Sequence, residues 1–318
     1  MSARPIVRAH VLLVLVTLVW GATFVEIKDA LGQSSPLIFN AVRMTLASAV
    51  LAAIYFRSLR RMSRRCFFAG IVIGLFLALG YAFQTTGLAY TTPAKSAFLT
   101  GLSVVLVPVF LALFWRKRAG AWNVAGVIAA FMGLYLLTVP AAPGGRWGDL
   151  AGVNFGDLLT ILCAIAFAFQ IILVGRATIL HSFENLAILQ TATAAVVMSA
   201  AAPLVESVHI AFSLRVVAAL LVTGLLGTAA AFTIQAWAQQ FISATNTALI
   251  FALEPVFAWL TSYLLLGERL GWRAGAGALL ILGGLLASEI LGAHSERISP
   301  PSTQPGFSPP STPSPPSS

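Results

Sequence analysis

Long apolar runs recur along almost the whole chain, and no other feature constrains the fold as strongly. A helix that crosses a bilayer needs about 20 mostly apolar residues, because it rises 1.5 Å per residue and the hydrocarbon core is about 30 Å thick. The sequence therefore predicts an all-α polytopic membrane protein with ten transmembrane helices. The ten runs are residues 10–31, 36–56, 66–90, 96–115, 122–139, 155–175, 185–205, 212–236, 244–266 and 271–291.

The composition agrees with a lipid environment. Of the 318 residues, 58% are hydrophobic and only 9% are charged, whereas a soluble domain carries about 25% charged residues. A net charge of +9 can indicate nucleic acid. The basic residues lie between the apolar runs, however, so we interpret them as membrane-loop charges. We expect a lipid bilayer around the chain and no nucleic-acid partner.

Motifs for catalysis, metal binding or ATP hydrolysis are missing from the sequence. There is no G-x-x-x-x-G-K-[ST] loop, no H-E-x-x-H motif and no cluster of Cys and His. Cys66 and Cys163 are far apart, so we interpret them as buried thiols. We therefore expect no enzyme activity, no cofactor, no metal and no ATP-driven pumping by this chain.

The basic residues are divided unequally between the two sides of the predicted membrane. With a cytoplasmic N-terminus, twelve of them fall on the inside and six on the outside. The cluster RSLRRMSRR at 57–65 contributes most to this bias. Because cytoplasmic loops are enriched in Lys and Arg, both termini are predicted to be cytoplasmic.

The two halves of the chain show weak similarity at an offset of 150, as at Ala94 and Ala244. Five helices is an odd number, so a second five-helix copy enters the membrane from the opposite side. We therefore expect two inverted repeats, 1–153 and 154–295, around a central cavity with a site near the midplane. Residues 296–318 are rich in Pro and Ser and are predicted to form a disordered cytoplasmic tail.

Glu254 directly precedes Pro255 inside the apolar stretch FALEPVFAWL. An ionised side chain at this depth costs about 2.5–3.5 kcal/mol on insertion scales. A proline costs about 3 kcal/mol in a helix interior. Both penalties fall where the backbone lines protein or a wet cavity. The stretch thus predicts a cavity-lining or gating Glu254 at a kink, or else a structural Glu–Arg pair.

The sequence alone leaves alternatives for the roles of three charged residues. Arg43 lies inside the second run and either pairs with Glu254 or binds a substrate carboxylate with its planar fork. Glu26 either faces the cavity near its outer mouth or lies at the membrane interface. Burial favours the neutral form of a carboxyl group, so Glu254 is also a candidate carrier for protons as the coupling ion.

Uncharged residues complete the candidate site. Trp20 lies in the middle of a run, away from the aromatic belt of a membrane interface, and is a candidate cavity wall. Gln84 and Gln170 lie inside runs, where an amide either contacts a ligand or joins helices. Asp157 opens the sixth run, and we interpret it as a helix cap because an acidic residue suits the first turn.

Five stretches of the sequence form an ordered set: WGATFVEIKDAL, SPLIFNAVRMTLA, GYAFQTTGLAYTTPAKSAFLTGLSVVLVPVF, GDLLTILCAIAFA and LIFALEPVFAWLTSYLLLGERL. In these stretches the chain resembles the drug/metabolite transporter superfamily, in its EamA-type, ten-helix branch. The resemblance implies two inverted five-helix repeats, secondary transport that is usually efflux of amino acids or other small metabolites, and a bacterial inner membrane. The residues that map onto the family pattern are Trp20, Gly21, Lys28, Arg43, Glu254, Pro255, Gly267, Glu268 and Arg269. Glu26 and the tail lie outside the pattern.

The sequence is thus expected to encode an alternating-access exporter of small metabolites. The candidate substrate-binding or gating residues are Trp20, Glu26, Arg43, Gln84, Gln170 and Glu254, with a helix kink at Pro255. A facilitative pore is the first alternative. A membrane sensor or scaffold that acts through its Pro-rich tail is the second. The oligomeric state is open.

Overall fold

The computed structural model describes residues 3–88, 90–91, 93–117, 119–138, 154–266 and 271–298. Within them the secondary structure is helical apart from one isolated antiparallel bridge, Ser34–Ile210. The helices are α1 (Ala3–Leu31), α2 (Pro36–Ile54), α3 (Phe56–Leu59), α4 (Arg64–Leu88), α5 (Pro93–Gly101), α6 (Ser103–Trp115), α7 (Ala121–Thr138), α8 (Phe155–Ala177), α9 (Phe183–Val205), α10 (Leu214–Gly224), the π-helix η2 (Leu225–Ala230), α11 (Ala231–Ala238), α12 (Ala244–Phe251), α13 (Glu254–Leu266) and α14 (Trp272–Ile298).

Helical segments occupy every predicted run. Among the described residues, eight helical stretches are long and apolar enough to cross a membrane, and the stretch 121–137 is a shorter apolar helix. The run 244–266 is divided between α12 and α13. The prediction of an all-α polytopic membrane protein is confirmed, whereas the count of ten crossings and the inverted repeat remain predictions.

Some helices extend beyond the apolar runs that predicted them. α1 begins at Ala3, and α14 continues to Ile298, past the boundary predicted for the tail. An apolar run marks the part of a helix that suits lipid, whereas the hydrogen-bonded helix can continue into water. The rest of the predicted tail, residues 299–318, and the loop 139–153 lie outside the described residues.

Asp157 caps α8, as its position in the sequence indicates. Its backbone N–H donates to Asn154 Oδ1, and its own Oδ2 accepts from the Asn154 N–H, both at 2.9 Å. Thr91 Oγ1 donates to Asp157 Oδ1 at 2.6 Å. This reciprocal pair is a capping box, which satisfies N–H groups that a helix start leaves free. The interpretation of Asp157 as a structural cap is confirmed.

A second carboxylate, Glu206, caps a helix from a distant part of the chain. Its two oxygens accept the backbone N–H groups of Leu37 at 3.0 Å and Ile38 at 2.9 Å, at the start of α2. Glu206 itself directly follows α9. The carboxylate therefore ties the loop after α9 to the N-terminal end of α2, where the helix dipole favours negative charge.

Loop contacts separate into two ends of the bundle. At one end, Ser35 N–H donates to the His209 carbonyl at 2.9 Å, which joins the α1–α2 and α9–α10 loops. At the other, Asn185 Nδ2 donates to the Ser58 carbonyl at 3.3 Å, which joins the start of α9 to α3. The predicted topology places the first pair of loops outside and the second pair inside. The contacts thus agree with the predicted alternation of helix directions.

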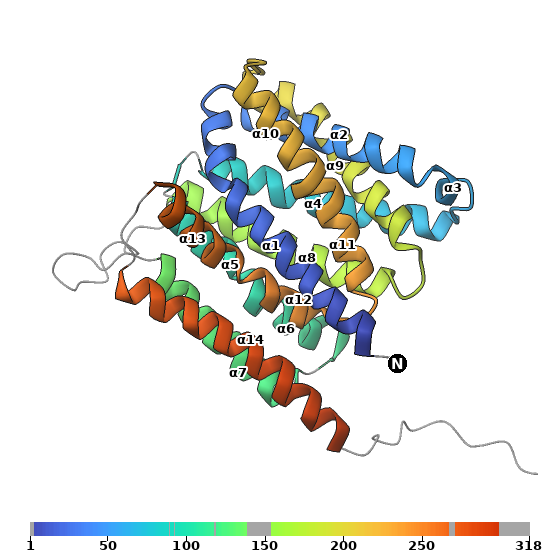
Figure 1. Ribbon diagram of the computed structural model, residues 1–318. Helices are drawn as coiled ribbons and strands as arrows, with labels where there is room; N and C mark the ends of the chain where they lie inside the picture. The colour runs from blue at the N-terminus through green and yellow to red at the C-terminus, as the bar shows by residue number, and fades with distance from the viewer. Residues whose placement is uncertain are drawn as a thin grey trace, which may run out of the picture.

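Glycines allow α7 and α14 to pack side by side along the lower edge of the bundle (Figure 1). A Cβ atom on Gly133 would lie 2.5 Å from the Gly277 carbonyl oxygen, and one on Gly126 would lie 2.6 Å from that of Gly284. Only glycine fits such a distance. Small residues at these positions bring two backbones into direct contact, as is common between membrane helices.

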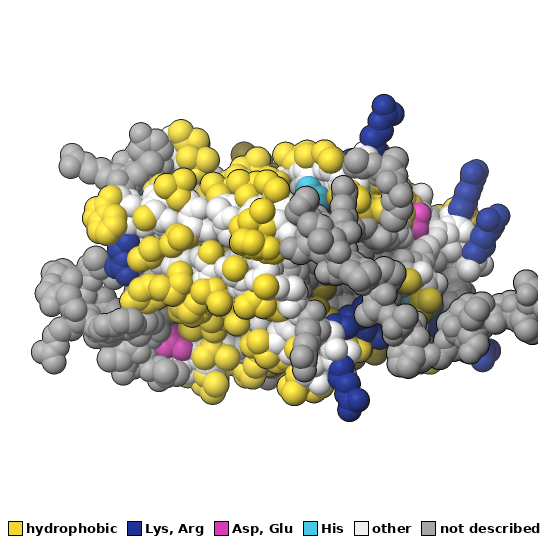
Figure 2. Space-filling view, turned by 90° about the horizontal axis from the view of Figure 1, so that it is seen from below, with side chains coloured by type: hydrophobic (Ala, Val, Ile, Leu, Met, Phe, Trp, Pro, Cys, Tyr) yellow, Lys and Arg dark blue, Asp and Glu magenta, His cyan; other side chains and the backbone are white. Residues whose placement is uncertain are grey.

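The outer surface of the bundle is apolar. Leu204, Leu214 and Trp272 are each 84–86% exposed, and Figure 2 shows a band of hydrophobic side chains over the face seen there. Most Lys and Arg side chains visible on this face lie toward the end where Figure 1 places the N-terminus. An exposed apolar surface of this extent suits lipid rather than water.

Candidate substrate-binding cavity

A cavity of about 180 Å³ lies inside the bundle, and both predicted halves of the chain contribute to it. α1, α2 and α4 supply walls from the first half, and α8, η2 and α13 supply walls from the second. Most of its lining is apolar. Of the residues that the sequence nominated, Trp20, Arg43, Gln84, Gln170, Glu254 and Pro255 all line this cavity.

A break in the helix places Glu254 at the cavity. α12 ends at Phe251, and α13 begins at Glu254 after a two-residue turn. The sequence predicted a kink at Pro255 within one helix, and the structure corrects this to the start of a new helix. Pro255 lies in the first turn of α13, where its missing N–H removes no helix hydrogen bond. The proline penalty expected for a helix interior therefore does not apply.

The first half contains a similar break. α5 ends at Gly101, and α6 begins at Ser103, and both residues line the cavity. Non-helical backbone at membrane depth is tolerated where it is covered by protein or lines a polar space. The sequence predicted a kink at Pro255 but no irregularity here, because Gly101–Ser103 carries no proline or charge.

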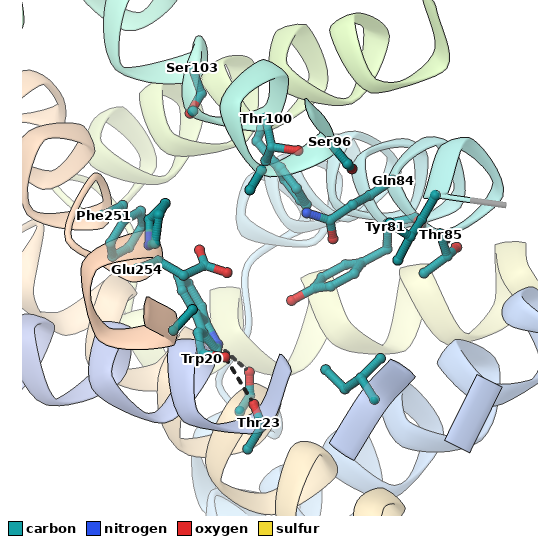
Figure 3. Close-up of a pocket in the computed structure, with 18 of the residues that line it drawn as sticks. Trp20, Thr23, Tyr81, Gln84, Thr85, Ser96, Thr100, Ser103, Phe251 and Glu254 are labelled. Carbon is teal, nitrogen blue, oxygen red and sulfur yellow. Dashed lines mark hydrogen bonds between the residues drawn. The ribbon is translucent and has the colours of Figure 1, made fainter. Parts of the chain in front are cut away.

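The carboxyl group of Glu254 points into the cavity. In Figure 3 it lies opposite the hydroxyl group of Tyr81, and the Gln84 amide lies on the same side as Tyr81. Within the part of the chain that the structure describes, Glu254 makes no ion pair and its side chain accepts no hydrogen bond. A carboxyl group in this position is available to a ligand or a proton.

Close backbone packing holds Glu254 against α1. A Cβ atom on Gly21 would lie 2.6 Å from the Ala258 nitrogen and 2.8 Å from the Glu254 carbonyl oxygen. Trp20, one residue earlier, packs edge-on against Phe251 with ring centroids 5.0 Å apart. α1 therefore contacts both sides of the break between α12 and α13.

Arg43 is buried at 3% exposure and does not pair with Glu254. Its Nε–H donates to Thr228 Oγ1 at 3.2 Å. The guanidinium carbon lies 4.6 Å from the centre of the Tyr81 ring, a cation–π distance. Among the described residues no carboxylate lies within 4.0 Å of Arg43. The structural alternative of a buried Glu–Arg pair is therefore not what the structure shows.

The π-helix η2 supplies the partners of both Arg43 and Trp20. Trp20 Nε1–H donates to the Gly227 carbonyl at 2.7 Å, and Thr228 Oγ1 donates to the Thr223 carbonyl at 2.8 Å. Short π-helical segments occur often at functional sites. Neither Thr228 nor Tyr81 was indicated by the sequence, because a hydroxyl inside an apolar run commonly bonds only to its own helix.

Gln170 belongs to a network of buried amides. Its Nε2 donates to Gln190 Oε1 at 2.9 Å and to Gln235 Oε1 at 3.2 Å, and Gln235 Nε2 donates to Gln239 Oε1 at 3.3 Å. These contacts join α8, α9 and α11, so Gln170 links helices as well as lining the cavity. Gln84, by contrast, makes no side-chain hydrogen bond among the described residues.

Glu26 does not line the cavity, which corrects the expectation that it faces the cavity mouth. Its side chain is exposed, whereas Thr23, Ile27 and Leu31 of the same helix line the cavity. Successive helix residues are rotated by about 100°, so Glu26 points away from the face that Ile27 presents. Its exposure fits the interfacial alternative.

Lipid-compatible helices surround an internal cavity that is lined by helix breaks and by two charged side chains, which form no ion pair within the described residues. This arrangement is typical of a membrane transporter. The sequence profile of the EamA-like transporter family matches residues 7–139 and 154–288. The chain therefore belongs to the EamA-like transporter family.

Known proteins with similar sequences are described as transporters. An uncharacterized transporter of Archaeoglobus fulgidus is 34% identical over 270 residues, which are 85% of this chain and 82% of that protein. The uncharacterized transporter YoaV of Bacillus subtilis is 24% identical, over 85% of this chain and 92% of its own. A crystal structure shares the fold with a TM-score of 0.74 at 19% identity, and the match covers 91% of this chain and 99% of that one.

Proposed function

We propose that this protein is a secondary active transporter that exports small metabolites, such as amino acids or related compounds, by alternating access. The observation that carries the proposal is the cavity itself, where Arg43 and Glu254 face a common space without pairing. Burying two charges without mutual compensation is unfavourable for stability. A bound substrate supplies the missing partners, which gives this arrangement a functional reason.

The size of the cavity favours a small substrate. Pockets for drug-sized ligands have volumes of about 300–1,000 Å³, and this cavity measures about 180 Å³. Its aromatic walls include Trp20, Phe232 and Phe251. We therefore assign it to compounds with a polar or charged group and a short apolar part. Trp20, Gln84 and Gln170 serve as walls, and Glu26 has no role there.

Protons are the proposed coupling ion, with Glu254 as their carrier. A carboxyl group that has no ion-pair partner among the described residues is able to exchange between neutral and charged forms as the cavity changes access. We place the protein in the bacterial inner membrane with both termini in the cytoplasm, in agreement with the twofold excess of basic residues in the loops predicted to be inside.

The first test is metabolite analysis of spent medium from cells that produce the wild-type protein, Glu254→Gln or Glu26→Gln. We expect one class of small metabolite to accumulate outside with wild type and with Glu26→Gln, and not with Glu254→Gln. The Glu26 variant is a matched control because it makes the same change at an exposed carboxylate. Equal accumulation with Glu254→Gln would make Glu254 a structural residue.

The mechanism is then tested in vesicles that contain the purified protein and the metabolite so identified. Saturable flux that responds to an imposed pH gradient supports coupled alternating access. Flux that does not saturate supports the facilitative pore, and indifference to the gradient excludes proton coupling. Deletion of residues 296–318 is expected to leave transport largely intact, whereas a sensor or scaffold acting through the tail would lose its function.

A further inference from the structure

Arg43 and Asp157 are both buried charged residues, yet their surroundings differ. Asp157 is 1% exposed and accepts hydrogen bonds from the Asn154 N–H and from Thr91. Arg43 is 3% exposed and has no acidic group within ion-pair distance in the described chain. A buried charge is normally paired. Among the described residues Arg43 therefore has no counter-charge, and it lines the cavity.

The guanidinium group keeps most of its hydrogen-bonding capacity. It has five N–H donors in a planar fork. Nε–H is used by Thr228, and the ring and hydroxyl of Tyr81 lie against the group. Both partners are neutral, so neither supplies negative charge. Nε–H is the only guanidinium donor for which the described residues show a hydrogen bond within 3.5 Å, and Arg43 lines the cavity.

The π-helix fixes the direction of this fork. Thr228 donates its hydroxyl hydrogen to the Thr223 carbonyl, which leaves its oxygen to accept from Arg43 Nε. Trp20 holds the neighbouring Gly227 carbonyl at 2.7 Å. One edge of the guanidinium is thus attached to η2 and one face to Tyr81. A guanidinium group that is held in this way is pre-organised to donate two parallel hydrogen bonds to a planar anion.

We propose that Arg43 binds the carboxylate group of the transported compound, and that Thr228 is its positioning residue. A carboxylate matches the fork with two parallel N–H···O bonds and supplies the missing negative charge. The chemical class is a small organic carboxylate with an apolar chain that contacts the aromatic walls. The inference rests on the proposed function only in taking the bound compound to be the transported one.

The test measures ligand-induced thermal stabilisation of the detergent-purified, full-length protein. Two series of different size are used at millimolar concentration. The larger series is 4-methylvalerate, L-leucine, isoamylamine and 4-methylvaleramide, and the smaller is propionate, L-alanine, propylamine and propionamide. We expect the carboxylate-bearing compounds of at least one series to stabilise the wild type, and the amine and the amide of that series to have no effect.

Variants connect this binding to Arg43. Removing a charge-assisted hydrogen-bond pair is expected to weaken carboxylate binding at least about tenfold in Arg43→Gln, with a smaller loss in Arg43→Lys. Thr228→Val keeps the charge and is expected to lose several-fold in carboxylate affinity while unfolding at nearly the wild-type temperature. Thr233→Val is the matched control, because the Thr233 hydroxyl donates to the Ala229 carbonyl four residues earlier and Thr233 is not among the residues that line the cavity.

Three results would overturn the proposal. One is that no carboxylate in either series stabilises the wild type, or that the amine or amide is as effective as the carboxylate. Another is that chloride or inorganic phosphate alone reproduces the effect. The last is that Thr228→Val and Thr233→Val behave alike and Arg43→Lys binds as wild type does.

These experiments distinguish a failure of the carboxylate-binding inference from a failure of the proposed transport function. A protein that binds carboxylates through Arg43 but moves no solute across vesicles keeps this inference and loses the proposed function. A protein that exports a compound without a carboxylate, and does so equally well in Arg43→Lys, keeps the proposed function and loses this inference.

Discussion

Individual glycines decide how closely the helices approach. Gly21 lies where α1 crosses α13, and the space for its missing side chain is filled by backbone atoms of Ala258 and Glu254. For Gly275 of α14, no atom of the described residues lies within 4 Å of the same position. Two glycines in apolar helices thus have opposite packing roles, and their spacing in the sequence does not distinguish them.

Replacing Gly21 by Ala is therefore expected to destabilise the protein. A Cβ atom 2.6 Å from the Ala258 nitrogen forces α1 and α13 apart, and overpacking of this kind costs about 1–3 kcal/mol. Thermal unfolding in detergent is the measurement, with Gly275→Ala as the control. A loss of stability as large in Gly275→Ala as in Gly21→Ala would contradict the packing argument.

At the scale of elements, helix ends are held by groups from distant parts of the chain. α2 begins at Pro36, and the cap of its first turn comes from Glu206, 169 residues away from Leu37. A local cap belongs to the helix it serves, whereas this one exists only when α2 and α9 are correctly placed. The cap at the start of α2 therefore depends on the correct packing of α2 and α9.

The change Glu206→Gln tests this long-range cap. Losing the carboxylate at the N-terminus of α2 is expected to reduce stability by about 1 kcal/mol. For a chain of this size that corresponds to a fall of the unfolding temperature by about 2–4 °C or slightly less. Glu26→Gln removes an exposed carboxylate and is expected to leave the temperature unchanged. Equal shifts in both variants would show that only the net charge matters.

The helices themselves were the predictable part of this fold. Apolar runs specify them because lipid requires every backbone polar group to be bonded within the segment. Glu254 and Pro255 were also visible, since each is costly inside such a run. The partner of Arg43 was not, because the choice among Glu254, Thr228 and a ligand depends on side-chain directions that only packing determines. Glu26 shows the same limit, as a rotation of about 100° separates it from the cavity face.

At the scale of the whole molecule, the two predicted halves meet at the bridge between Ser34 and Ile210. The predicted topology places this bridge on the outer side. In the proposed export by alternating access, we expect the halves to separate there when the substrate leaves. A covalent link across the bridge is therefore expected to stop the cycle without unfolding the protein.

Cysteines at positions 34 and 210 test this expectation, in a background where Cys66 and Cys163 are replaced by Ser. Residues directly opposite in an antiparallel pair have Cα atoms about 4.5–5.5 Å apart, which is within the range for a disulfide. We expect vesicle transport to stop on oxidation and to return on reduction. Either single-cysteine variant is the control. Unchanged transport in the oxidised double variant would mean that this end of the bundle does not open.

Trp20 also makes the cavity visible to spectroscopy. Its indole ring lines the cavity, contacts Phe251 and donates its N–H to the Gly227 carbonyl. The wavelength of maximum indole fluorescence depends on the polarity of the surroundings. A solute that enters the cavity is therefore expected to shift the emission maximum of Trp20. The chain has seven tryptophans, and the difference between the spectra of wild type and Trp20→Phe isolates this one. Cavity filling can then be followed in real time, on unlabelled protein and with unlabelled solutes.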